Sequence, residues 1–191
     1  MNGEGRALFG RMEANPVIAA IRREGDVEAA LLSSVGTVFL LNADIFNLAQ
    51  LTERFREAGK DVLVHMDFLE GIGRDAKAVR YLAEVIRPSG ILTTKSQHVK
   101  VAQEYGIFVI QRFFLIDNQS FDMALRTVHS AKPDMVELMP ALMPAVIRRF
   151  TQAVSTPVIA GGLISTKEEI LDILKAGAVG ASTSNPDLWA V

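Results

Sequence analysis

The sequence predicts a compact (β/α)₈ barrel with minimal loops. Eight short, almost wholly apolar runs recur along the chain, and each has the length and composition of a parallel strand buried on both faces. The runs repeat every ~23 residues, which leaves room for one helix and two tight loops in each unit. Eight units favour closure of the sheet, although 191 residues fall just below the usual lower bound of about 200 for this fold. An open, doubly wound parallel sheet is the alternative.

The predicted elements follow from local patterns. The expected strands are Val17–Ile21, Thr37–Leu41, Val62–Met66, Gly90–Thr94, Ile107–Gln111, Met135–Met139, Val158–Gly161 and Val179–Thr183. Between them the apolar residues take helical spacing, and Leu48, Leu51 and Phe55 for example share one face. We find no domain boundary, so residues 1–191 are expected to form one barrel domain.

Helix signals agree with this alternation. Asp26 is expected to cap a helix that begins at Val27, and Ser165-x-x-Glu168 has the form of a capping box. Residues 1–15 precede the first strand and are expected to form a short helix over the bottom of the barrel. Three apolar residues share one face of that helix: Leu8, Phe9 and Met12.

The composition excludes several classes of protein. The chain has 20 Lys and Arg against 22 Asp and Glu, so its formal charge of −2 argues against a strongly basic nucleic-acid module. It has no Cys, which excludes disulfide scaffolds, Cys-based zinc sites, iron–sulfur clusters and thiol catalysis. No apolar run reaches the roughly 18 residues of a membrane-spanning helix, and no hydrophobic signal core follows the N-terminus. We therefore expect a cytoplasmic globular protein without a membrane partner.

Polar residues gather where the predicted strands end. In a parallel barrel these carboxyl ends form the functional face. The candidate ligand-binding residues there are Arg22, His65, Asp67, Lys95, Gln111, Arg112, Glu137, Gly161, Gly162, Ser182 and Thr183. The three histidines do not have a metal-ligand spacing, and we expect neither a metal nor a cofactor.

The last two units carry the most specific signal. Pro157–Ser165 is a strand that runs into two glycines and a capped helix, and Gly177–Asn185 repeats this theme. Glycines let backbone N–H groups approach an anion, and the loops after strands seven and eight are the frequent phosphate site of barrels. We therefore expect a phosphate site at these loops. The ordinary alternative is a tight turn followed by a helix cap.

The charged candidates allow several roles. Glu137 lies in an apolar strand, so it must be paired or aimed at a ligand. It could act as a general base, bond ligand hydroxyls, or form an ion pair with Arg112. Lys95 begins a helix and is expected to contact an anion, or to be a charge in the capping region, rather than to form a Schiff base. Asp67 could bind hydroxyls, pair with a cation or hold a divalent ion, and Arg22, like Arg112, suits phosphate.

Taken in order, these motifs make the chain resemble the glycerol uptake operon antiterminator regulatory proteins of bacteria. The stretches that carry the resemblance are Asn15–Arg22, Val64–Ile72, Gly90–Ser96, Gln111–Asp117, Val136–Pro140, Pro157–Leu163 and Ser182–Asn185. The resemblance implies a small barrel that responds to glycerol 3-phosphate and binds the leader of its target messenger RNA. Transcription would then pass a terminator ahead of glycerol-utilisation genes.

Two other functions compete with this regulator. A phosphosugar enzyme of the isomerase, epimerase or aldolase type would use Glu137 or Lys95, and a ligand-binding barrel could act on a protein partner. The near-zero net charge and the 7% aromatic content argue against RNA binding, but the resemblance outweighs them. We therefore expect a non-enzymatic regulator with no catalytic residue. Its RNA site would be a local basic patch, which a homo-oligomer could assemble across subunits.

Overall fold

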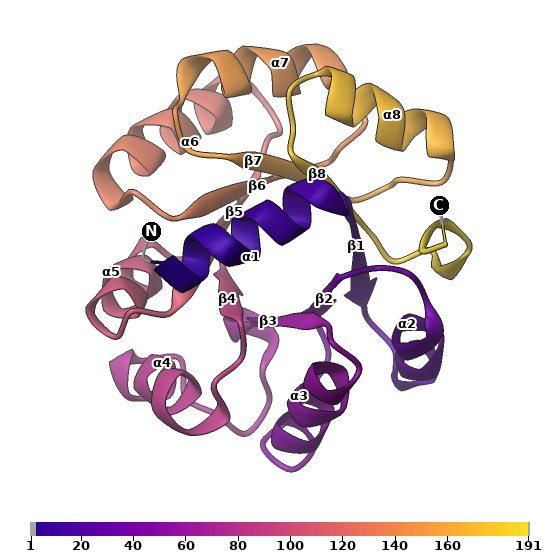
Figure 1. Cartoon of the computed structure of the whole chain (residues 1–191). Coiled ribbons are helices and arrows are strands. Elements are labelled where there is room, and N and C mark those ends of the chain that lie inside the picture. Colours follow the sequence, from indigo (N-terminus) through magenta and orange to yellow (C-terminus); the bar gives the residue numbers. More distant parts are fainter. Residues whose placement is uncertain (1–2, 191) are drawn as a thin grey trace.

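The predicted strands form a closed parallel barrel in the computed structural model, which describes residues 3–190 (Figure 1). Each strand pairs with the next in sequence, and β8 pairs with β1 to close the ring. The open-sheet alternative is therefore wrong. The strands are β1 (Val17–Ile21), β2 (Thr37–Leu40), β3 (Asp61–His65), β4 (Gly90–Thr93), β5 (Phe108–Phe114), β6 (Met135–Met139), β7 (Val158–Gly161) and β8 (Gly180–Thr183).

Helices surround this barrel. They are α1 (Gly3–Ala14), α2 (Val27–Leu32), α3 (Leu48–Glu57), α4 (Ala76–Tyr81), α5 (Ser96–Glu104), α6 (Asn118–Ala131), α7 (Pro144–Ala153) and α8 (Lys167–Lys175). After β8, the part of the chain that the structure describes has only the short 3₁₀ turn Pro186–Leu188. Within residues 3–190, none of the helices is long and apolar enough to cross a membrane.

Helix α1 lies across the amino-terminal end of the barrel (Figure 1). Its Leu8 and Met12 are buried against a layer of inward-facing strand residues, and Phe9 is half-buried beside them. That layer consists of Ile18, Phe39, Leu63, Leu92, Phe108, Ile110, Met135 and Ile159. The interior of the barrel at this end is thus filled by apolar side chains.

Two helix starts differ from the sequence predictions, and one strand end differs by more than a single residue. The capping box is formed one residue later than expected, by Thr166 and Glu169, because Glu169 reaches back to the Thr166 N–H. Asp26 precedes α2 but makes no side-chain cap bond. Strand β5 continues to Phe114, three residues beyond its predicted end, since residues 112–114 pair with β6.

Candidate functional site

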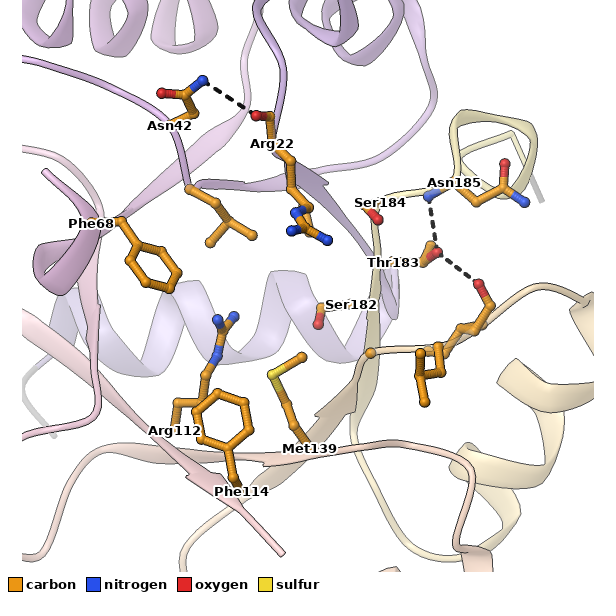
Figure 2. Close-up of a pocket in the computed structure, with 15 residues that line it drawn as sticks. Arg22, Asn42, Phe68, Arg112, Phe114, Met139, Ser182, Thr183, Ser184 and Asn185 are labelled. Atoms are coloured by element: carbon orange, nitrogen blue, oxygen red, sulfur yellow. Dashed lines mark hydrogen bonds between the residues drawn. The ribbon is translucent and has the colours of Figure 1, made fainter.

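A pocket of about 610 Å³ opens at the carboxyl-terminal end of the barrel (Figure 2). Its walls come from β1, β5, β6 and β8 and from the segments that follow β1, β2, β3, β7 and β8. The lining residues are Ala20, Arg22, Leu41, Asn42, Phe68, Arg112, Phe114, Met139, Gly162, Leu163, Ile164, Ser182, Thr183, Ser184 and Asn185. Five of the eleven candidates from the sequence therefore line one pocket.

A buried ion pair forms the floor of this pocket. Side chains alternate along a strand, so residues two positions beyond the apolar layer again face inward. Arg112 and Glu137 occupy such positions on β5 and β6, and Arg112 Nε donates to Glu137 Oε2 at 2.6 Å. The Ser182 hydroxyl donates to Glu137 Oε1, also at 2.6 Å. Both oxygens of this fully buried carboxylate are engaged, so Glu137 holds Arg112 in place and is not free to act as a base.

The loop after β7 has an unusual backbone. Gly162 has φ +85° and Leu163 φ +64°, and a branched side chain such as leucine rarely adopts this left-handed region. Neither the Leu163 N–H nor the Ser184 N–H takes part in a hydrogen bond within residues 3–190. Two backbone donors from neighbouring loops thus border the pocket, which is the arrangement that binds phosphate in barrels.

Two arginines face the space between these loops and β5. Figure 2 shows the guanidinium groups of Arg22 and Arg112 pointing into the pocket. Arg22 is exposed and forms no ion pair among residues 3–190, whereas the charge of Arg112 is balanced by Glu137. Because Arg22 is uncompensated, the pocket has a net attraction for an anion.

Gly161 has a packing role rather than a place on the pocket wall. A Cβ at this position would lie 2.0 Å from Ser182 Oγ and 2.9 Å from Glu137 Oε1. Only glycine therefore permits the Ser182–Glu137 hydrogen bond. By contrast, Gly162 lines the pocket, and its positive φ favours glycine at this position.

We expect Gly161→Ala to lower the free energy of unfolding by about 1–3 kcal/mol through overpacking. Adding Ser182→Ala removes the nearest atom, so the double variant should lose less than the two single losses combined. Gly25→Ala is the matched control, because a Cβ there meets nothing within 4 Å. Urea denaturation compares each of these variants with the wild type. Equal stability of the Gly161 and Gly25 variants would contradict this packing.

His65 is buried in the barrel next to the pocket and has no hydrogen-bond partner. Its side chain is 1% exposed, and neither ring nitrogen bonds any atom of the described chain. Its ring stacks on that of Phe68, with centroids 4.1 Å apart. Burial, together with the positive charge of Arg112, lowers the pKa of His65 to about 3. The imidazole is therefore neutral at physiological pH.

Besides Glu137, Gly161 and His65, three more candidates lie outside the pocket. Asp67 accepts bonds from the Thr94 N–H, at 2.7 Å, and from the Thr94 and Thr93 hydroxyls. Burial opposes its ionisation, but these bonds outweigh burial and hold the pKa of Asp67 below its usual value. Lys95 is the N-cap residue of α5. Gln111 alternates with Arg112 and so faces outward, where its side-chain amide donates to Ser96 Oγ on α5.

The aromatic part of the site is absent from the sequence predictions. Phe68 and Phe114 both line the pocket and are 51% exposed. The predicted site contains only glycines and polar residues, whereas an aromatic residue at a strand end is itself a signal, since ligand pockets are largely apolar. As for metals, residues 3–190 contain no group of three His, Asp or Glu side chains that could hold an ion.

Comparison with known proteins identifies the family. Residues 17–189 match the family model described as glycerol-3-phosphate responsive antiterminator. The chain belongs to this family. Members of the glycerol-3-phosphate responsive antiterminator family are regulators of transcription, in agreement with the resemblance of the ordered motifs.

Solved structures agree with membership of the antiterminator family. The glycerol uptake operon antiterminator regulatory protein of Listeria monocytogenes is 32% identical, with a TM-score of 0.88 over 91% of this chain and 94% of that one. An antiterminator-related protein of Thermotoga maritima is also 32% identical, with a TM-score of 0.82 over 92% and 98%. The protein YgcP of Escherichia coli is 32% identical over 96% of both chains. Aldolases at 14% and 15% identity share the fold alone.

Proposed function

We propose that the chain is a cytoplasmic antiterminator that binds glycerol 3-phosphate in this pocket and, when occupied, binds the leader mRNA of glycerol-utilisation genes. The phosphate would lie against the N–H groups of Leu163 and Ser184, beside Gly162. Arg22 would neutralise one of its charges, and the glycerol would extend over Arg112 towards Phe68.

One observation carries the phosphate assignment. Two free backbone donors, a strained left-handed turn and an uncompensated arginine meet at the loops after β7 and β8. Such strain persists where the surrounding structure enforces it, and it concentrates at ligand sites. A turn that served only to reverse the chain would need neither the exposed Leu163 at φ +64° nor an unpaired arginine in the same pocket.

The geometry favours a regulator over a phosphosugar enzyme. Glu137 would be the base of an isomerase, but Arg112 and Ser182 occupy its two oxygens. Lys95 would be the Schiff-base residue of an aldolase, but it does not line the pocket. The polar groups that do line it are suited to hold an anion rather than to move a proton.

A filter-binding titration with a terminator-bearing leader RNA tests this function. We expect glycerol 3-phosphate to increase RNA retention by the wild type and by Gly25→Glu, whose site is open surface. Gly162→Glu places a carboxylate in the phosphate site, so its RNA retention should not respond to the ligand. If RNA retention by the wild type does not depend on glycerol 3-phosphate, and the protein turns over a triose phosphate, the result would instead support the enzyme.

A further inference from the structure

A buried histidine with two unsatisfied nitrogens is costly. A buried polar group without a hydrogen bond costs about 1–3 kcal/mol, and folded proteins leave few of them. Packing does not offset this cost, since a leucine would fill the same space without burying polar atoms. His65 is moreover neutral, so each nitrogen keeps one role: one donates a hydrogen bond and the other accepts one. A ligand hydroxyl, which both donates and accepts, matches it.

Phe68 separates His65 from the pocket. It follows His65 by three residues, at the end of the 3₁₀ turn Met66–Phe68, and the two rings stack at an angle of 20°. Phe68 lines the pocket while His65 does not. Because Phe68 is 51% exposed, its ring can leave this position without breaking the core. Figure 2 shows Phe68 across the pocket from Ser184, at the end where the glycerol of a bound ligand would lie.

The chain just beyond Phe68 is tied to the loop after β2. The Glu70 N–H donates to the Ala43 carbonyl at 3.1 Å, and the Ile45 N–H donates to the Glu70 carbonyl at 3.0 Å. The next residue, Phe46, is 92% exposed. Two backbone hydrogen bonds therefore connect the segment that follows Phe68 to the loop that carries the exposed Phe46.

We propose that Phe68 is a ligand-driven gate over His65: the glycerol hydroxyls displace its ring, hydrogen-bond the imidazole and shift the loop that carries Phe46. This inference rests on the proposed function and supplies its switch. Phosphate alone binds at the far loops and leaves the gate closed, so the gate selects a phosphorylated polyol over inorganic phosphate. The ligand would also have different affinities for the protein with the gate open and with the gate closed, which a population shift requires.

A tryptophan at position 68 reports the gate. We expect Phe68→Trp to show a red-shifted emission with glycerol 3-phosphate and no shift with inorganic phosphate, after subtraction of wild-type spectra, which contain only Trp189. Phe114→Trp is the matched control, because Phe114 is equally exposed and lines the same pocket. Its response should be the same for both ligands.

A second variant tests the proposed hydrogen bond between the ligand and His65. His65→Leu keeps the volume but removes both nitrogens, so its affinity for glycerol 3-phosphate should fall by about 3- to 10-fold, the worth of one neutral hydrogen bond. Its affinity for inorganic phosphate should not change. His65→Gln, which can still donate and accept, should recover part of the loss. Isothermal titration calorimetry gives the three affinities.

The outcomes distinguish failure of the gate from failure of the proposed function. If glycerol 3-phosphate neither binds the wild type nor raises its melting temperature, both proposals fail. If it binds, but the emission of the Phe68→Trp variant responds equally to both ligands or to neither, the gate is wrong and the proposed function stands. The gate is likewise wrong if His65→Leu binds both ligands as the wild type does.

Discussion

Glu137→Ala is expected to destabilise the folded chain by about 3–5 kcal/mol, because it leaves the Arg112 guanidinium buried without its counter-charge. The Arg112 side chain is only 4% exposed, so water cannot replace the lost carboxylate. The Ser182 hydroxyl also loses its acceptor. Chemical denaturation of the wild type and the variant under the same conditions measures the difference.

A double variant distinguishes the ion pair from simple loss of volume. Adding Arg112→Met to Glu137→Ala removes the unpaired charge, and the double variant should recover much of the lost stability. It should nonetheless bind glycerol 3-phosphate weakly, since Arg112 lines the pocket. A double variant as unstable as the combined single losses would show that Glu137 is not needed to neutralise Arg112.

Patterns repeated along the whole chain were sufficient to predict the barrel. Parallel strands buried on both faces give continuous apolar runs, so all eight strands could be located, three of them with the observed bounds. The end of β5 differs from the prediction because Arg112 interrupts its apolar run. That arginine is tolerated inside the barrel only because Glu137 is its neighbour in register, which is a property of the folded sheet.

The site was harder to predict, because proximity across the barrel decides it. Gln111 and Arg112 are adjacent on β5, and side chains alternate along a strand, so only one of the two can face the pocket. Asp67 shows a different limit: nothing near it in the sequence indicates that Thr93, at the end of β4, and Thr94, just beyond it, donate hydrogen bonds to its carboxylate. The loops after β7 and β8, which border the pocket, could be singled out from the sequence because glycines and a helix start lie together in the chain.

The stability of the protein should fall by about 2 kcal/mol between pH 7.5 and pH 5.0 through His65 alone. In the unfolded chain this histidine takes up a proton below about pH 6.5, whereas in the folded chain its pKa is about 3. The unfolded state therefore binds more protons throughout this window, and stability decreases as the pH falls. The carboxyl group of Asp67 titrates below this range, since its folded pKa lies under 3.8. Urea unfolding at several pH values measures the slope.

Two variants test the cause of that slope. His65→Leu cannot titrate, so its stability should change by about 2 kcal/mol less over the same range. Phe68→Ala uncovers the imidazole, and because burial is the main cause of the low pKa, its slope should become shallower too. Arg112 remains beside His65 in that variant and continues to oppose protonation, so part of the slope should survive. A wild-type slope in Phe68→Ala would mean that Phe68 does not keep His65 from water, and it would remove the physical basis of the gate.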